Sequence, residues 1–252
     1  MRLTPDSPVA AKVFPSPNHG ERRGVERPDS IILHYTGMPT GESALQWLCN
    51  PVSDVSCHYF VWEDGHVLQL VPESRRAWHA GRGHWAGADD LNSHSVGIEI
   101  VNPGHEGDLP GFPNVQIESV IRLCADICAR HSIKPQRVLA HSDIAPARKR
   151  DPGEKFPWDV LHRGGVGHWV EPAPIGSGRF FGPGDEGQPV QALQAMFGMY
   201  GYGLAITGVY DATTEHVVRA FQRHFRQARV DGVADASTIT TLRNLIAAQA
   251  SP

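Results

Sequence analysis

The sequence has no long apolar run and no large excess of either charge. No segment approaches the roughly 18 consecutive apolar residues that predict a membrane span. The N-terminal stretch also lacks the apolar core of a secretory signal. The net charge of −4 over 252 residues favours neither nucleic acid nor an anionic membrane surface as a partner. These absences predict a cytoplasmic protein without a membrane span, or a periplasmic one if a leader has been removed.

Cysteine is scarce, and its spacing argues against a structural zinc knot. The four cysteines show no Cys-x-x-Cys spacing. Cys124 and Cys128 lie four residues apart on the apolar side of a predicted helix. Buried, reduced thiols are the simpler interpretation of this pair.

Apolar patterning in the first 165 residues predicts both strands and helices. Short runs rich in Ile, Leu and Val have the length of buried strands, and Asp64-Gly65 between two such runs predicts a hairpin. A stripe from Ile117 to Cys128 repeats at helical spacing. The expected fold class is α/β, a mixed β-sheet flanked by helices, after an irregular segment at 1–28. The predicted strands are 30–34, 57–62, 66–71, 95–101 and 137–140, and the predicted helices are 43–49 and 117–128.

A second region differs in composition from the first. Residues 166–186 are rich in Gly and Pro and predict a linker. Apolar stripes beyond it predict three helices, which open near Val190, Ala212 and Ala236. A domain of about 65 residues is near the lower size for a self-sufficient core. The expected organisation is a first domain at 1–165, the linker at 166–186, and a small three-helix domain at 187–252.

Two histidines and an aspartate have the pattern of a catalytic zinc site. His34 follows the apolar run 31–33 and His141 follows 138–140, so each lies where a buried strand emerges. Asp151 comes ten residues after His141. Two imidazoles and one carboxylate make three protein ligands and leave a fourth position for water, which is the catalytic arrangement. Zinc would lower the pKa of that water toward about 7 and polarise a carbonyl group.

Two further residues are candidates for a hydrolytic site. Glu99 lies inside an apolar strand, so it is expected either to pair with an arginine or to face the site as a general base. Lys149 comes two residues before Asp151 and is either an oxyanion-stabilising group or a solvated loop lysine. The spacing alone leaves these alternatives open.

Four blocks of the sequence resemble those of the AmpD-like (type 2) N-acetylmuramoyl-L-alanine amidases. Residues 141–153 read HSDIAPARKRDPG, close to the family signature HSDIAPxRKxDPG. The resemblance implies a zinc enzyme that hydrolyses the amide between N-acetylmuramic acid and L-alanine, with the fold of peptidoglycan recognition proteins. The other blocks occur in the family's order at 32–36, 78–81 and 92–99.

The resemblance also implies roles for individual residues. His34, His141 and Asp151 would bind Zn²⁺. Glu99 would be the general base and acid, and Lys149 would support the transition state.

Contacts with substrate are implied for three more residues. Trp78 and His79 would border the substrate cleft, and Asn92 would lie near the catalytic strand. Trp78 could equally belong to the core, and Asn92 could be a turn residue. Gly83 stands where the family often has a serine, so one substrate contact could be missing without any effect on the zinc site.

The C-terminal region resembles a three-helix peptidoglycan-binding domain. The likeness places the chain with the larger, two-domain AmiD-like branch. Its function could be wall binding, or it could have been reduced to packing against the first domain. The matching segments are Val190–Gln194, Gly208–Asp211, Ala220–Gln222 and Asp231–Val233.

The expected function is recycling of 1,6-anhydro-N-acetylmuramoyl peptides, so the expected partners are muropeptides or peptidoglycan fragments. One alternative is a non-catalytic muropeptide sensor of the same fold, which the presence of all three metal ligands disfavours. The other is an exported or lytic amidase that acts on intact wall. Removal of the residues from about Gly182 onward is expected to leave activity on soluble fragments intact. The sequence specifies no oligomeric state.

Overall fold

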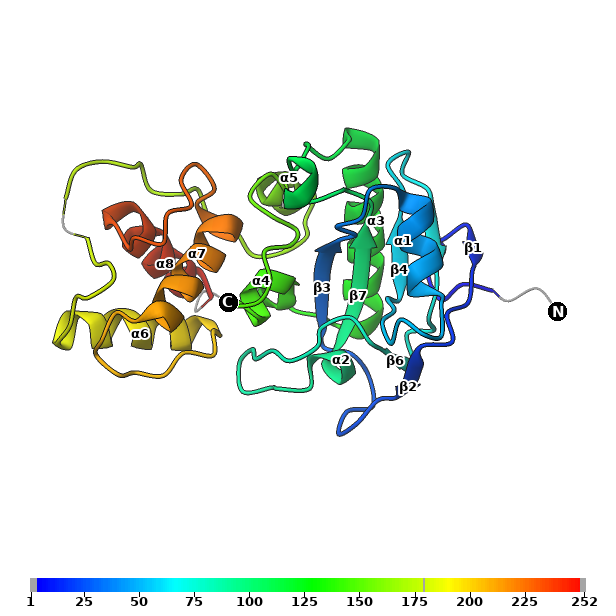
Figure 1. The fold of residues 1–252 in the computed structure, drawn as a ribbon, viewed down its shortest axis with the longest axis horizontal. Helices are drawn as coiled ribbons and strands as arrows, with labels where there is room; N and C mark the ends of the chain where they lie inside the picture. Colours follow the sequence, from blue (N-terminus) through cyan, green and yellow to red (C-terminus); the bar gives the residue numbers. More distant parts are fainter. Residues whose placement is uncertain (1–3, 179, 250–252) are drawn as a thin grey trace.

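A six-stranded mixed β-sheet is the centre of the first domain in this computed structural model, which describes residues 4–178 and 180–249 (Figure 1). Residues 1–3, 179 and 250–252 fall within the ranges predicted above and lie outside the described residues. Neighbouring strands are parallel except in the hairpin of β4 and β5, which confirms the prediction at Asp64-Gly65. In sheet order the strands are β1 (Lys12–Val13), β5 (Val67–Gln69), β4 (Tyr59–Val61), β7 (Ser95–Ile100), β3 (Ser30–Tyr35) and β8 (Val138–Ala140).

Helices account for most of the remaining regular structure. A separate two-stranded sheet joins β2 (His19–Glu21) to β6 (Arg75–Ala77), and short 3₁₀ turns cover His105–Gly107 and Pro135–Arg137. The helices are α1 (Gly41–Leu48), α2 (Leu91–His94), α3 (Asn114–His131), α4 (His141–Ile144), α5 (Trp158–Arg163), α6 (Gln188–Tyr200), α7 (Ala212–Phe225) and α8 (Ala236–Gln249).

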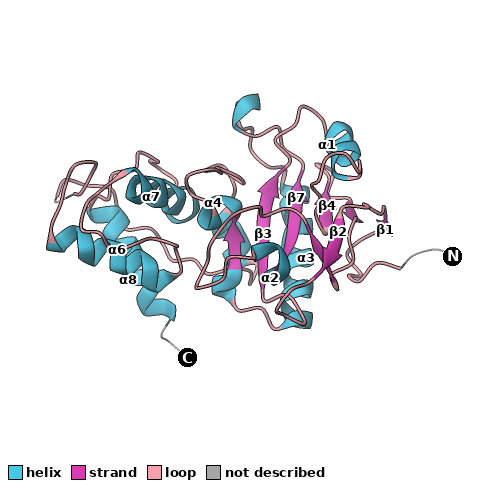
Figure 2. Cartoon of the chain, turned by 60° about the horizontal axis from the view of Figure 1, so that its bottom comes forward, coloured by secondary structure: helices cyan, strands magenta, loops and turns pink. Residues whose placement is uncertain are grey.

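The two faces of the sheet carry different partners because side chains alternate along each strand. Ile31 and Leu33 are fully buried in the core that the sheet shares with α3. Ile32 belongs to a second core, shared with α6, α7 and α8. Phe60 packs with Leu48 of α1 in a third cluster. Both views show α4 between the sheet and the C-terminal helices (Figures 1 and 2).

The N-terminal segment is more regular than the sequence predicts. Strand β1 adds to the sheet beside β5, where the Ala11 amide donates to the Val67 carbonyl (2.9 Å), and β2 pairs with β6. The prediction of irregular structure throughout 1–28 is therefore wrong for these strands. They are two and three residues long and are held by backbone partners far away in sequence, so no local apolar pattern marks them.

The three C-terminal helices are those predicted, and they share a buried core with the first domain. Trp85 of the first domain is 1% exposed and lies edge-on to Tyr202, with ring centroids 4.9 Å apart. Gly201 passes so close to this indole that a Cβ there would lie 2.7 Å from the ring. Ile32 and Ile144 belong to the same apolar cluster as the helices. The helical domain therefore packs directly on the first domain.

The structure bears on two compositional expectations. All four cysteines are free; Cys124 is buried, as predicted, and Cys128 is half-buried. Among the described residues, no helix is both long enough and apolar enough to cross a bilayer.

Candidate metal centre and active site

Three parallel strands bring the candidate ligands to one edge of the sheet. Strands β3, β7 and β8 run in the same direction, so their carboxyl ends meet at that edge. His34, near the end of β3, is paired in register with Glu99 of β7. His141 directly follows Ala140, the last residue of β8, which is paired with Leu33. The two histidines that the sequence places at strand ends are thus neighbours in space.

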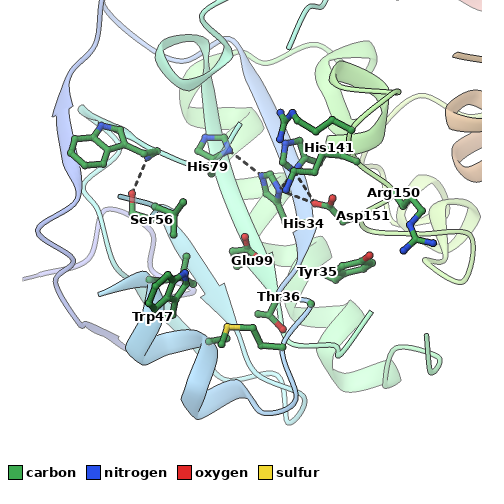
Figure 3. Close-up of a pocket in the computed structure, with 18 residues that line it drawn as sticks. His34, Tyr35, Thr36, Trp47, Ser56, His79, Glu99, His141, Arg150 and Asp151 are labelled. Atoms are coloured by element: carbon green, nitrogen blue, oxygen red, sulfur yellow. Dashed lines mark hydrogen bonds and ion pairs between the residues drawn. The ribbon is translucent and has the colours of Figure 1, made fainter. Parts of the chain in front are cut away.

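His34, His141 and Asp151 converge on one point (Figure 3). His34 Nδ1 lies 2.9 Å from His141 Nδ1 and 3.0 Å from Asp151 Oδ2. His141 Nδ1 lies 2.9 Å from the same carboxylate oxygen. All three residues are buried. Two imidazole nitrogens and one carboxylate oxygen are a donor set that suits Zn²⁺.

The Nε2 atom of each ring has a hydrogen-bond partner outside the cluster, which leaves Nδ1 available to bind a metal ion. His141 Nε2 lies 3.0 Å from the Ala80 carbonyl, which can only accept, so the proton of the neutral ring is at Nε2 and its Nδ1 keeps the lone pair. His34 Nε2 lies 3.0 Å from His79 Nδ1, and His79 Nε2 lies 3.2 Å from Ser95 Oγ. A proton on each Nε2 satisfies this whole chain. Both Nδ1 lone pairs then point at the same place, so the residues fit a metal ion.

The electrostatics of His34 and Asp151 favour the protonation states that a metal requires. Burial and the neighbouring His141 lower the pKa of His34 to about 4, against the opposing effect of Asp151. Burial alone would raise the pKa of Asp151, but the two imidazoles outweigh it and hold that pKa well below its usual range. Neutral imidazoles beside an ionised carboxylate are the forms that bind metal.

Glu99 lies beside the triad with one oxygen free. Its Oε2 is buried and has no hydrogen-bond partner among the described residues, so the alternative of a pair with an arginine finds no support. Burial raises the pKa of Glu99 well above its usual range, and Asp151 adds to this, while Lys149 acts in the opposite direction. A raised pKa makes a carboxylate a stronger base, which suits a group that takes up a proton and later releases it.

A cleft of about 460 Å³ surrounds these groups. Lys149 and two predicted substrate residues, Trp78 and His79, line it. Asn92 does not; it is buried, and its Oδ1 accepts from the amides of His79 (3.0 Å) and Ala80 (2.7 Å). What the structure shows for Asn92 is support of the 78–80 turn, and its contact with substrate stays a prediction.

Several lining residues were not singled out from the sequence. Four of them lie inside the blocks that resemble the family, so their closeness in sequence to the predicted ligands could have identified them as lining residues. Trp47 was marked only by being a large aromatic residue outside the apolar side of α1, where it is 47% exposed. In Figure 3 it lies on the side of the cleft opposite Arg150. The missed residues are Tyr35, Thr36, Trp47, Arg148 and Arg150.

Comparison with protein families gives two matches along the chain. A family model described as N-acetylmuramoyl-L-alanine amidase matches residues 24–154. A model of a peptidoglycan binding domain matches residues 186–242.

Individual relatives agree with these matches. The N-acetylmuramoyl-L-alanine amidase AmiD of Escherichia coli (strain K12) is 37% identical over 223 residues, which are 82% of this chain and 78% of the relative. The 1,6-anhydro-N-acetylmuramyl-L-alanine amidase AmpD of Enterobacter cloacae is 33% identical over 61% of this chain and 89% of its own length.

Two solved structures extend the likeness to the whole fold. E. coli AmiD in complex with the substrate anhydro-N-acetylmuramic acid-L-Ala-D-γ-Glu-L-Lys has a TM-score of 0.75 and 34% identity, covering 92% of this chain and 98% of that one. AmpDh3 of Pseudomonas aeruginosa, in complex with anhydromuramic pentapeptide, has a TM-score of 0.72 and 29% identity, covering 94% and 96%. This chain therefore belongs to the N-acetylmuramoyl-L-alanine amidase family and is an amidase with a C-terminal peptidoglycan-binding domain.

Proposed function

We propose that this amidase hydrolyses the amide between 1,6-anhydro-N-acetylmuramic acid and L-alanine of the stem peptide, as part of peptidoglycan recycling. The observation that carries the proposal is the unpartnered Glu99 Oε2 beside three converging metal-ligand atoms. The substrate bound to E. coli AmiD and the anhydromuramic pentapeptide bound to AmpDh3 support the choice of sugar. A cytoplasmic location is expected for such a role, and cell fractionation with immunodetection tests it.

His34, His141 and Asp151 are proposed to hold Zn²⁺ through Nδ1, Nδ1 and Oδ2. A zinc ion bound there supplies a Lewis acid, which polarises the scissile carbonyl and makes a water molecule more acidic. His79 and the Ala80 carbonyl fix the orientation of the two imidazoles, because each engages one Nε2.

Glu99 is proposed to move the protons of the reaction. Its carboxylate takes a proton from the attacking water as the C–O bond forms, and later delivers it to the nitrogen of L-alanine as the C–N bond breaks. Lys149, which lines the cleft, is proposed to stabilise the negative charge on the carbonyl oxygen between these steps. The products are a free carboxylate on the sugar and a free amine on the peptide.

The proposed domain functions follow the two family matches. We assign catalysis to 1–165, a connection to 166–186 and binding of peptidoglycan to 187–252. The amidase match, 24–154, lies within the first range, and the peptidoglycan-binding match, 186–242, begins one residue before the last range.

Mass spectrometry of the products from a soluble anhydromuramoyl tripeptide tests the function. We expect free peptide and free anhydro-sugar, loss of both products on addition of a chelator, and recovery when Zn²⁺ is restored. Intact wall serves as the comparison substrate. Cleavage of neither substrate by the zinc-loaded protein would overturn the proposal in favour of a muropeptide sensor, and faster cleavage of intact wall would overturn the recycling role.

A further inference from the structure

A second cavity, of about 230 Å³, lies between residues 146–150 and helix α7 of the C-terminal domain. We call it the cationic groove, because six of its lining residues are basic. No carboxylate is among the described residues that line it. The basic residues are Arg148, Lys149, Arg150, His216, Arg219 and Arg223.

The cationic groove lies directly beside the catalytic cleft. Arg148, Lys149 and Arg150 line both cavities, and Asp151 of the metal-ligand triad follows them in the chain. Arg150 lies at the edge of the close-up beyond Tyr35 and Asp151 (Figure 3). A group joined to the scissile bond by a few peptide units can therefore reach the groove.

The positive charges of the groove exceed the carboxylates that contact them. Arg150 pairs with Glu106 (2.9 Å) and Arg219 pairs with Glu215 on its own helix (2.7 Å). The side chain of Arg223 is 12% exposed, and its Nε lies 3.6 Å from Glu154 Oε2, too far for a hydrogen bond. This Nε is buried and has no hydrogen-bond partner in the described part of the chain. An excess of positive charge around one buried, unused donor favours an anion.

We propose that the cationic groove binds a free carboxylate of the stem peptide while the scissile amide occupies the cleft; this assignment rests on the proposed amidase function. In the substrate bound to E. coli AmiD, the glutamate is linked through its γ-carboxyl, so its α-carboxylate is free, as is the carboxylate of the terminal lysine. The uncharged sugar offers no such group. The planar fork of an arginine pairs two N–H groups with one carboxylate, which suits Arg223 because its Nε is unused. Arg219 adds positive charge, while its Nε and Nη2 donate to Glu215.

The test compares soluble substrates that differ only in peptide charge. One is the anhydromuramoyl tripeptide with both carboxylates free, and the others carry an amide at the glutamate α-carboxyl, at the C-terminus, or at both. We expect amidation to lower kcat/KM about fivefold to tenfold, mainly through KM, because an ion pair in a partly buried groove is lost. The singly amidated substrates identify which carboxylate is bound. The preference should also shrink as salt concentration rises.

A double variant, R219Q/R223Q, removes the charge on the protein side and leaves the proposed catalytic residues unchanged. It should lose the same five- to tenfold on the charged substrate and nothing on the doubly amidated one. R163Q is the matched control, because Arg163 also forms a pair at i, i+4 spacing, with Asp159 at 2.7 Å, but lies outside the groove. Thermal unfolding and zinc content are measured for each protein.

The outcomes separate this proposal from the one on which it rests. Cleavage of charged and amidated substrates at equal rates by the unaltered protein would overturn the groove assignment and leave the amidase function intact. Cleavage of none of them would overturn the function itself. A double variant that discriminates as strongly as the unaltered protein would show that the carboxylate binds elsewhere.

Discussion

At the scale of single residues, Glu99 has the environment of a group that moves protons. Its pKa is raised by burial, and its Oε2 has no partner. We expect Glu99→Gln to lower kcat about 10²- to 10⁴-fold, because an amide cannot accept the proton of water. Zinc content, measured by elemental analysis, should not change. Glu42→Gln, at an exposed site on α1, is the control, and a Glu99→Gln protein that turns over at a near-normal rate would remove Glu99 from the mechanism.

Also at the scale of residues, His79 fixes the orientation of the His34 ring through its Nε2 atom. His79 joins His34 Nε2 to Ser95 Oγ, and its ring packs over Gly97, where an added Cβ would lie 2.4 Å from His79 Cγ. We expect His79→Ala, and also Gly97→Ala through displacement of the ring, to weaken zinc binding about 10- to 100-fold. Competition with a chromophoric chelator measures the affinity. His79→Gln, whose amide oxygen can accept from His34, should restore part of it. His162→Ala, at an exposed histidine, should bind zinc normally. Unchanged affinity in His79→Ala would exclude this role.

At the scale of elements, a buried carboxylate fastens the end of α3 to the sheet. Glu73 is 3% exposed and accepts from Arg130 and His131 of α3 and from Tyr59 of β4. Burial would raise the pKa of Glu73, but hydrogen bonds from Arg130, His131 and Tyr59 outweigh it and lower that pKa to about 2. A depressed folded-state pKa stabilises the fold above the unfolded-state pKa of about 4.5, and the gain is lost as the pH falls toward about 2.

Glu73→Gln should therefore destabilise the protein in a pH-dependent way. We expect a loss of roughly 2 kcal/mol at pH 7, which shrinks steadily below about pH 4.5. Urea unfolding at pH 7, 5 and 3 measures the difference. Glu63→Gln, at an exposed position of the hairpin, should show almost no difference at any of these values. If the loss of unfolding free energy in Glu73→Gln were the same at all three pH values, packing and not charge would hold α3 there.

The elements also show where sequence-based prediction succeeded and where it ended. Buried strands such as β3 and β7 can be predicted because each is a run of apolar residues. His34, Glu99 and His141 stand out as candidate site residues because each interrupts or ends such a run. Strands β1 and β2 leave no such mark, since only backbone bonds to distant partners define them. The supporting role of His79 depends on Gly97 and Ser95 of another element, and only the fold brings these together.

At the scale of the whole molecule, the C-terminal helices take part in the structure around the proposed metal ligands. Asp143 of α4 is fully buried and accepts from Tyr202 Oη (2.8 Å) and from His224 (2.7 Å), both in the helical domain. It also accepts from the amide of Ala140 (2.8 Å), the residue just before His141. The same carboxylate thus links the second domain to the backbone beside His141, a proposed metal ligand.

This contact changes the expectation that the chain keeps its activity on soluble fragments when the helical domain is removed. Truncation at about residue 182 would leave Asp143 without Tyr202 and His224, and would expose Trp85 and the face of Trp158 on which His224 stacks (3.6 Å between ring centroids). The apolar surface that the helices cover on the first domain would then be in contact with water, which is unfavourable and promotes association. We therefore expect the truncated chain to be poorly soluble and much less stable than the full chain.

A milder change tests the same coupling in the full-length protein. Tyr202→Phe removes the hydrogen bond to Asp143, and Tyr210→Phe removes an equally buried one, to the Gly232 carbonyl (2.6 Å), entirely within the helical domain. Both should lower Tm by about 4 °C, since each loses one buried hydrogen bond in a chain of this size. Only Tyr202→Phe should also weaken zinc binding, because only that bond leads to the backbone at His141. Equal zinc affinities for the two variants would show that the C-terminal domain stabilises the fold without positioning the metal centre.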